Sequence, residues 1–430
     1  MLKEIAVLDP RMMALMFFVA SYIGFIFLPK RRTLIAIAGA LLLILSGAIS
    51  WPEAFSAINW NIMGIFVGML IVADVFMDSR VPARFAEIIV DKAPNTAWAI
   101  LFLCALTGFI SAFVENVATV LIVAPVALSL AKKLKFNPVN MMIAIAISSN
   151  LQGAATLIGD PPSMLLGGFA KMTFSDFFFY QGRPSIFFAV ELGAIVSFFV
   201  LYMFFRKHKE KNREIEIEKV RSWVPTGILA ALIILLAMSS FYDAGFTHLA
   251  GLLCMTAGII AIIWHKIAVR GDIIKNIRSL DWATTLFLIG IFILVGSLTV
   301  NGWIDVIANY LSLLVGSNIF LGYTLIVFLS VFFSAFIDNV PLLATMLPVA
   351  ISMSAKLGIN PSLFLFGLLI GASLGGNITP IGASANIVAC SLLRKEGYEV
   401  TFKEFVKMGL PFTLTAVTAA YLFVWFIWSK

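Results

Sequence analysis

Residues 111–163 read SAFVENVATVLIVAPVALSLAKKLKFNPVNMMIAIAISSNLQGAATLIGDPPS, a stretch in which acidic and amide side chains interrupt an apolar sequence. Residues 334–382 repeat residues 111–159 at a constant offset of 223 without a gap, and 19 of the 49 pairs are identical. The identities include Asn116 with Asn339 and Gly159 with Gly382. Because a shared apolar composition alone does not match Asn, Pro and Gly, the chain is predicted to contain two copies of one structural unit.

The composition indicates a polytopic membrane protein. Of the 430 residues, 61% are hydrophobic and 12% are charged, and the mean hydropathy is +1.01. Soluble domains have about 45–50% apolar and about 25% charged residues. Several uncharged runs approach the roughly 20 residues that a membrane-spanning helix needs. The net charge of +7 is therefore interpreted as a signal of membrane orientation and not of nucleic-acid binding. The three cysteines are far apart and predict neither a disulfide framework nor a metal site.

The first half is predicted to contain spans at 11–28, 33–50 and 58–78, an interfacial helix at 79–95, and a final span at 184–205. The first run is predicted to be a retained helix and not a signal peptide. Segment 97–131 is interrupted at Glu115 and Asn116 and has basic residues at both ends, which favours a re-entrant hairpin; a through-going pair of helices is the alternative. A half-span at 138–149, an unwound stretch at 150–162 closed by Pro161 and Pro162, and a second half-span at 163–171 follow.

The second half is predicted to follow the same plan after a charged cytoplasmic linker at 206–222. Its spans are expected at 224–241, 247–264 and 282–299, followed by an interfacial segment at 301–317 and a broken hairpin at 320–354. A discontinuous span at 361–391 unwound at GGNITPIGAS, an interfacial piece at 394–408 and a last span at 410–428 complete the chain. Residues 1–205 and 223–430 are thus the predicted repeats.

Each repeat contributes five transmembrane helices and one hairpin, and because five is odd the second repeat must be inverted. With Lys30–Arg32 in the cytoplasm, 24 basic residues lie inside and six outside, which places both termini outside the cell membrane. The predicted fold is an all-α polytopic membrane protein of two inverted-topology repeats, with discontinuous helices at mid-membrane. Inverted repeats with broken helices are typical of secondary transporters.

Other functional classes lack support in the sequence. A channel would need a repeated polar stripe, which no span shows. A membrane enzyme would need a catalytic constellation, and no HExxH, GxSxG or Walker string occurs. ATP-driven pumping would require a separate ATPase subunit.

The strings SAFVENVATVLIVAPV, SAFIDNVPLLATMLPV, GAATLIGDPPSMLLG and GGNITPIGASANIVA resemble the Ion Transporter superfamily. The chain is most similar to the clade of arsenite permeases, NhaD-type sodium–proton antiporters and the P protein, which are CitMHS-like permeases. The resemblance implies a homodimer in membrane lipid. It also implies an elevator mechanism, in which a transport domain from 97–180 and 318–408 moves against a scaffold from 1–80 and 223–300.

Three carboxylates are the leading candidates for ion binding: Glu115 and Asp338 at the hairpin tips and Asp160 at a helix break. The carboxylate-transporting branch has Ser-Asn-Thr at the tips, whereas acidic tips repel a carboxylate substrate and suit a cation or proton. An ionised side chain at mid-membrane costs at least about 2.5–3.5 kcal/mol, so each must be protonated, bound to a cation or paired. No Lys or Arg falls within the predicted core segments, and an internal ion pair is therefore not expected. The alternative is a purely structural role, in which these carboxylates cap free backbone N–H groups at the helix breaks. Glu191 is interpreted as interfacial.

Neutral groups complete the predicted site, because hard cations prefer oxygen ligands. A Na⁺ ion is expected to use Asp160 and Asp338 together with the tip amides of Asn116 and Asn339. The further side chains are Thr119, Asn150, Thr156, Ser163, Asn377, Thr379, Ser384 and Asn386, and the backbone at the breaks comes from Gly153, Gly159, Gly376 and Gly382. The helix halves that start near Ser163 and Ser384 direct their positive N-terminal ends toward the site, so an anionic substrate remains an alternative.

The predicted function is exchange of an inorganic ion, Na⁺ or arsenite, against H⁺. A Na⁺-coupled anion or dicarboxylate symporter of the same superfamily is the alternative, and an ion channel ranks below both. No organic cofactor is expected, since H⁺ and Na⁺ would serve as coupling ions.

Overall fold

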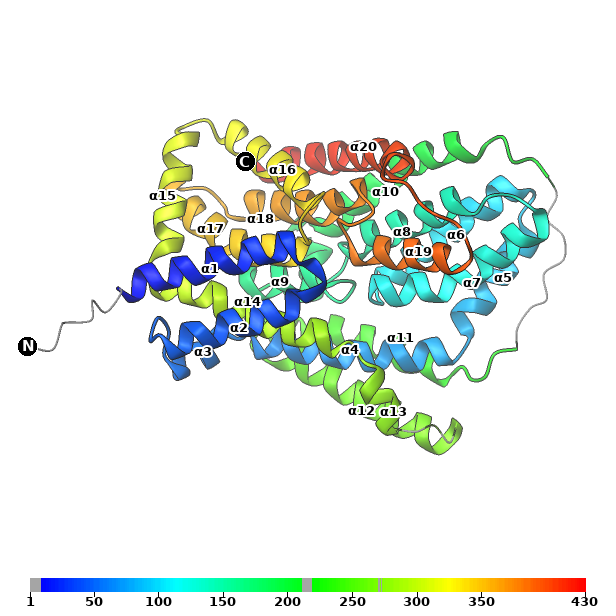
Figure 1. The fold of residues 1–430 in the computed structure, drawn as a ribbon, viewed down its shortest axis with the longest axis horizontal. Coiled ribbons are helices and arrows are strands. Elements are labelled where there is room, and N and C mark those ends of the chain that lie inside the picture. The colour runs from blue at the N-terminus through cyan, green and yellow to red at the C-terminus, as the bar shows by residue number, and fades with distance from the viewer. Residues whose placement is uncertain (1–8, 211–218, 270, 272) are drawn as a thin grey trace, which may run out of the picture.

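The computed structural model describes residues 9–210, 219–269, 271 and 273–430 and consists almost entirely of helices (Figure 1). Residues 211–218 of the predicted linker lie outside the described residues. Eight of the described helices are long and apolar enough to cross a membrane: α1, α4, α7, α10, α12, α14, α17 and α20. The all-helical membrane architecture predicted from the sequence is therefore confirmed.

The first repeat begins with α1 (Pro10–Phe27), η1 (Pro29–Arg31), α2 (Arg32–Leu45), α3 (Trp51–Ala57), α4 (Trp60–Asp78) and α5 (Val81–Lys92). It continues with α6 (Thr96–Ser111), α7 (Asn116–Leu134), α8 (Val139–Gly153), α9 (Pro161–Ala170), η2 (Ser175–Phe177), the strands β1 (Phe179–Tyr180) and β2 (Arg183–Pro184), and α10 (Ile186–Phe205). The two strands form a short antiparallel hairpin in which Tyr180 pairs with Arg183.

The second repeat begins with α11 (Val224–Ser239), α12 (Leu249–Val269), α13 (Ile273–Ser279), α14 (Trp282–Val300) and α15 (Trp303–Val315). It continues with α16 (Ile319–Ser334), α17 (Asn339–Leu357), α18 (Ser362–Leu369), the π-turn η3 (Ile370–Leu374), η4 (Gly376–Ile378), α19 (Ser384–Lys395) and α20 (Phe402–Trp428).

The boundaries of the hairpin helices repeat at the offset found in the sequence. Helices α6 and α16 both have 16 residues, and α7 and α17 both have 19. The local signals also repeat, because Asn95 caps α6 and Asn318 caps α16 with its side chain. Pro125 and Pro348 lie inside the second helix of each hairpin. The same local chemistry therefore builds both hairpins.

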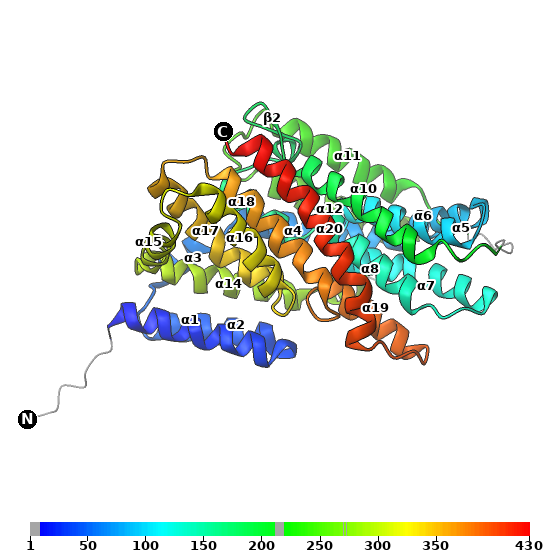
Figure 2. The ribbon, with the colours of Figure 1, turned by 90° about the horizontal axis from the view of Figure 1, so that it is seen from above.

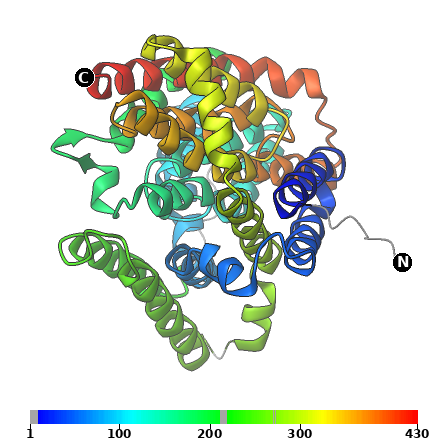
Figure 3. The same ribbon diagram turned by 90° about the vertical axis from the view of Figure 1, so that its left-hand side faces the viewer.

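The two repeats are inverted relative to each other. Hairpin α6–α7 and hairpin α16–α17 lie at opposite ends of the long axis of the molecule (Figure 1). The N-terminal pairs α1–α2 and α11–α12 lie on different sides of the bundle (Figures 2 and 3). Across the repeats α4 packs against α12, and α14 packs against α2.

Small residues allow these cross-repeat pairs to approach closely. A Cβ at Gly64 would lie 3.0 Å from the Cα of Gly251, and one at Gly290 would lie 2.7 Å from the Cβ of Ala36. Close helix packing through small residues is a common way to associate helices in membranes, where apolar burial adds little. The two pairs form the part of the molecule that was predicted to be a scaffold.

Two predicted boundaries differ from the structure. Helix α8 continues four residues into the predicted unwound stretch and ends at Gly153, because the polar side chains near its end bond to neighbouring elements and leave its helix intact. Residues 154–160 are non-helical, as predicted. The predicted interfacial piece 394–408 is wrong: α19 ends at Lys395, and residues 402–408 are the first two turns of α20, which runs unbroken to Trp428. A capping box between Thr401 and Glu404 starts α20.

Candidate functional site

Each hairpin tip ends in a carboxylate that caps the helix after it. Glu115 accepts a hydrogen bond of 3.0 Å from the backbone N–H of Ala118, at the start of α7. Asp338 accepts one of 3.0 Å from the N–H of Val340, at the start of α17. The capping alternative considered from the sequence is thus correct in part. Each carboxylate keeps a second oxygen, so capping does not account for the whole side chain.

Both tips reach the same central cavity. The cavity has a volume of about 40 Å³, and a water molecule occupies roughly 10–15 Å³ on this measure. Two tips that come from opposite ends and meet at one cavity support the re-entrant interpretation of the hairpins over the through-going one. The residues that line it are Arg32, Phe66, Leu70, Glu115, Asn116, Val117, Asn150, Pro161, Pro162, Asp281, Thr284, Phe287, Asp338, Asn339, Val340 and Ser384.

Arg32 pairs with Asp338 inside this cavity, contrary to the sequence-based expectation of no internal ion pair. Its guanidinium Nη1 contacts Oδ2 of Asp338. The side chains of Arg32 and Asp338 are 26% and 23% exposed. The expectation failed because Arg32 begins α2 in what the sequence presents as a loop, and its long side chain extends from the helix end to the tip.

A third capping carboxylate, Asp281, completes the charge distribution of the cavity lining. Asp281 caps α14 and accepts hydrogen bonds from the N–H of Thr284 at 2.9 Å and from its hydroxyl at 2.6 Å. The hydroxyl of Thr284 also lies 3.4 Å from Nη2 of Arg32, whose guanidinium lies 5.1 Å from the ring centre of Phe287. The cavity lining therefore contains three carboxylates and one guanidinium among its described residues.

A chain of buried amides joins the two repeats behind the cavity. Asn116 donates from Nδ2 to Oδ1 of Asn150 at 3.1 Å, and Asn150 donates to Oδ1 of Asn377 at 3.0 Å. Asn150 also donates to the carbonyl of Ser373 at 2.9 Å, and Asn377 donates to that of Ile147 at 3.1 Å. These bonds connect the first hairpin tip to the broken helix of each repeat.

Backbone carbonyl oxygens converge at the break of the first repeat. A Cβ on Gly159 would lie 2.9 Å from the carbonyl oxygen of Ser111 and 3.0 Å from that of Ala112, with the carbonyl of Gly153 closer still. The hydroxyl of Thr156 donates to the same Ala112 carbonyl. Glycine is required at this position because no side chain fits among three oxygens. An all-oxygen environment of this kind suits a hard cation.

The second repeat forms the same arrangement without the charge. A Cβ on Gly382 would lie 3.0 Å from the carbonyl oxygen of Ser334, and one on Gly376 would lie 2.6 Å from that of Gly382. Thr379 donates to the carbonyl of Ala335 at 2.5 Å. The residue that corresponds to Asp160 is Ala383, as the sequence offset predicts.

Asp160 is fully buried at the start of α9. Its Oδ1 accepts a hydrogen bond of 2.9 Å from the N–H of Ser163, whereas its Oδ2 has no hydrogen-bond partner in the part of the chain that the structure describes. Ser163 donates its hydroxyl to the carbonyl of Gly153 at 3.2 Å. In the other repeat Asn386 donates to the carbonyls of Gly376 and Thr379, each at 3.0 Å. The unpartnered oxygen makes Asp160 a candidate proton or cation acceptor.

The structure separates the predicted residues into two groups. Those that line the central cavity are Glu115, Asn116, Asn150, Asp338, Asn339 and Ser384. Those that instead bond to backbone or amides at the tips and breaks are Thr119, Thr156, Asp160, Ser163, Asn377, Thr379 and Asn386. No cluster of three His, Cys, Asp or Glu side chains close enough to hold one metal ion occurs among the described residues.

Sequence reasoning missed Arg32, Asp281 and Thr284. A signal for Asp281 was present, because Trp282 corresponds to Trp60 and both tryptophans follow a polar cap residue at the same helix start. The tryptophan pair, which is separated by 222 residues, therefore marked position 281 as a structural cap equivalent to Asn59. Only the fold shows that this cap faces a hairpin tip.

Comparisons with known proteins also indicate a membrane transporter, the class predicted from the sequence. The family model described as citrate transporter, CitMHS, matches residues 22–362 and 249–430. An uncharacterized transporter of Mycobacterium tuberculosis is 30% identical over 427 residues, which cover 96% of this chain and 97% of that protein. The human P protein is 26% identical over 481 residues, which cover 92% of this chain and 57% of the P protein.

Two solved structures share the fold. The YdaH transporter of Alcanivorax borkumensis superposes with a TM-score of 0.62 at 13% identity, covering 97% of this chain and 98% of that one. MtrF of Neisseria gonorrhoeae, described with a class of antimetabolite efflux pumps, gives a TM-score of 0.58 at 14% identity and covers 97% and 95% of the two chains. The family match, the relatives and the fold agree with the superfamily resemblance of the hairpin sequences. The chain therefore belongs to the CitMHS citrate transporter family and is a membrane transporter.

Proposed function

We propose that this transporter exchanges a small monovalent cation, with Na⁺ as the leading candidate, against H⁺ at the central cavity. The observation that carries the proposal is the charge of the lining, in which Glu115, Asp281 and Asp338 face a single guanidinium, that of Arg32. Partly buried carboxylates in excess need a proton or a cation. One site that accepts either ion is the requirement for exchange.

The size of the cavity supports a small ion over the substrate in the family's description. An engineered cavity that binds benzene has a volume of about 150 Å³, whereas the central cavity measures about 40 Å³. Citrate is larger than benzene and carries negative charge. In this conformation the site thus favours a cation with one or two water molecules over a dicarboxylate or tricarboxylate, and symport of a carboxylate is the less supported alternative.

An elevator mechanism is supported by unequal contacts between the predicted scaffold and the predicted transport domain in the two repeats. At the end of α9, a Cβ on Gly168 would lie 2.8 Å from Nδ2 of Asn59, which caps α4. The residue that corresponds to Asn59 in the second repeat is Asp281, which faces the hairpin tips in the central cavity. The starts of α4 and α14 are equivalent in the two repeats, yet α4 begins beside the end of α9 whereas α14 begins beside the hairpin tips. The two helix starts therefore contact the predicted transport domain at different depths along the membrane normal. This asymmetry is expected if that domain has moved along the scaffold toward the side on which α14 begins, the predicted cytoplasmic side.

Arg32 supplies a coupling device within this proposal. It lies on α2 of the predicted scaffold, whereas Asp338 lies on a hairpin of the predicted transport domain. The ion pair thus joins the two parts when no cation is bound. A cation that binds Asp338 must displace Arg32, and this displacement releases the carrier for movement. An empty carrier would remain held, which is the condition for obligatory exchange.

Arsenite is the second candidate substrate. Helices α9 and α19 both begin at the cavity, through Pro161, Pro162 and Ser384. The N-terminal end of a helix attracts oxyanions because its free N–H groups and its dipole point toward them. The helix starts therefore favour arsenite in its anionic form, whereas the carboxylates favour a cation.

The test is transport in proteoliposomes that contain the purified protein and a pH-sensitive dye. Addition of Na⁺ or Li⁺ outside should make the interior alkaline as H⁺ leaves, and Asp338→Asn should abolish the response. Asp91→Asn, which removes an exposed carboxylate on α5, is the matched control and should keep it. Silence to both cations together with a response to arsenite would transfer the function to the second candidate. Cation-dependent citrate uptake would instead support symport.

A further inference from the structure

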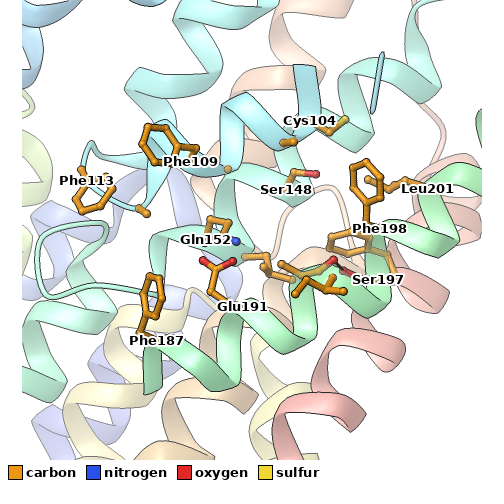
Figure 4. Close-up of a pocket in the computed structure, with 17 residues that line it drawn as sticks. Cys104, Phe109, Phe113, Ser148, Gln152, Phe187, Glu191, Ser197, Phe198 and Leu201 are labelled. Atoms are coloured by element: carbon orange, nitrogen blue, oxygen red, sulfur yellow. Dashed lines mark hydrogen bonds between the residues drawn. The ribbon is translucent and has the colours of Figure 1, made fainter. Parts of the chain in front are cut away.

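A second cavity lies between α6, α8 and α10, beside the first hairpin (Figure 4). Its volume is about 360 Å³, within the range of about 300–1,000 Å³ that is typical of sites for small organic molecules. It is therefore roomy enough for an organic ligand that the central cavity cannot hold. The proposed ion exchange makes no use of it.

The cavity opens toward apolar surroundings. At its rim, the side chains of Phe109 on α6 and Ile195 on α10 are 68% and 69% exposed. In a chain that spans a membrane, large apolar side chains with this exposure face lipid hydrocarbon. Phe113, Phe187 and Phe198 extend the aromatic lining inward (Figure 4). A ligand would enter from the bilayer and would need an apolar, preferably aromatic, body.

Glu191 gives this apolar cavity a negative charge. It lies on the second turn of α10 and is the only Asp, Glu, Lys or Arg among the described residues that line the cavity. Its carboxylate faces the side-chain amide of Gln152 across the cavity (Figure 4). A neutral amide does not compensate a carboxylate beside hydrocarbon, where an ionised group costs at least about 2.5–3.5 kcal/mol. The sequence-based interpretation of Glu191 as an interfacial group gave no account of this cavity.

Gln152 adds a second unsatisfied group at the same place. Its side chain is 9% exposed, and its Oε1 has no hydrogen-bond partner within the described residues. A buried amide oxygen without a donor loses about 1–3 kcal/mol of solvation. A carboxylate and a free amide oxygen together accept hydrogen bonds and offer negative charge. The complementary ligand group is an ammonium with N–H donors.

We propose that this cavity binds an amphipathic organic cation. The ammonium would pair with Glu191 and donate to Oε1 of Gln152, and the apolar body would lie among the phenylalanine rings, whose faces also attract cations. A zwitterionic phospholipid fits less well, because no described Lys or Arg in the lining would receive its phosphate. Anionic ligands are disfavoured for the same reason.

The proposal can be tested with 2-(1-naphthyl)ethylammonium, whose naphthalene ring is fluorescent. Binding is measured by fluorescence titration of the full-length protein in phosphatidylcholine nanodiscs. The neutral analogue 2-(1-naphthyl)ethanol has the same shape without the charge. Saturable binding of the ammonium is expected, with affinity for the alcohol at least tenfold weaker. Glu191→Gln should weaken ammonium binding about tenfold, which removal of one favourable charge contact of about 1.4 kcal/mol would produce.

Two further variants separate the cavity from general effects of charge and folding. Glu399→Gln removes an exposed carboxylate in the loop before α20 and should leave binding unchanged. Ala105→Phe fills the cavity without changing its charge and should abolish binding while the melting temperature is retained. Binding that ignores both Glu191→Gln and Ala105→Phe, or equal affinity for the alcohol, would overturn the proposal. Displacement of the probe by added phosphatidylethanolamine would assign the cavity to a lipid headgroup instead.

Discussion

Replacing Arg32 with glutamine should strengthen cation binding, although it removes an ion pair. In the native chain Arg32 neutralises Asp338, so an incoming cation must first displace the guanidinium. Glutamine keeps a side chain that can bond to Thr284 but carries no charge. The variant should therefore leave Asp338 available to the cation at all times.

The size of the effect follows from the burial of the pair. Exposed pairs contribute about 0.2–1 kcal/mol, and breaking a fully buried one costs about 3–5 kcal/mol. Arg32 and Asp338 are 26% and 23% exposed, which places them between these cases. We expect about 1–2 kcal/mol, equivalent to a factor of about 5–30 in the half-saturating cation concentration.

The assay is the half-saturating Na⁺ or Li⁺ concentration for alkalinisation in proteoliposomes at fixed pH. Arg31→Gln is the matched control, since Arg31 is adjacent and exposed and lies outside the central cavity. Arg32→Gln should lower the half-saturating concentration, whereas Arg31→Gln should leave it unchanged. The reasoning fails if Arg32→Gln raises this concentration at an unchanged melting temperature, or if both variants shift it equally.

Three other predictions concern the helix break at Gly159, the loop between α11 and α12 that contains Asp243, and the membrane topology of the two repeats. Gly159→Ala should abolish transport and lower the free energy of unfolding by about 1–3 kcal/mol through overpacking, because the added Cβ would enter the carbonyl cluster. Thermal melts measure this loss. The control Gly227→Ala, at a position in open space on α11, should be neutral or stabilising in these melts. Partial burial disfavours the ionised form of Asp243, but hydrogen bonds from Thr247, Leu249 and His248 outweigh this effect and lower the pKa of its carboxyl to about 2. The contribution of Asp243 to stability should therefore be complete above its unfolded pKa of about 3.9 and be lost as pH falls through about 2. Asp243→Asn should remove this acid-dependent step from melting curves. A cysteine at position 356 should react with an impermeant thiol reagent from outside and one at position 133 from inside, and labelling of both from one side would refute the inverted topology.

Repetition in the sequence made most of the fold predictable. The hairpin helices, their breaks and the broken helix of each repeat follow from the offset of 223, because matched Asn, Pro and Gly residues impose matched caps and turns. The continuity of α20 was not predictable in the same way. Lys403 and Lys407 gave its first turns an interfacial character, but they lie on one exposed face while Phe405 and Met408 on the other face are buried.

The site was only half predictable for a physical reason. Residues at the tips and breaks interrupt apolar helices, so the cost of placing them in a membrane marks them in the sequence. Arg32 and Asp281 lie at helix starts, where charged residues are ordinary. Their importance comes from the level at which the hairpins meet the helices of the scaffold, and that level is set by packing between segments separated by 306 residues. The charge asymmetry between Asp160 and Ala383, by contrast, was visible directly from the repeat.

The central claim is that a cation and a proton compete for the same carboxylates. Proton release from the purified, weakly buffered protein on addition of Na⁺ or Li⁺ tests this claim most directly. The native chain should release protons in a saturable manner near neutral pH. Glu115→Gln should reduce the amount released because it removes a carboxyl that can hold the proton, and Asp338→Asn should reduce it because it weakens cation binding. Saturable cation binding without proton release, or release that both variants leave unchanged, would contradict the account.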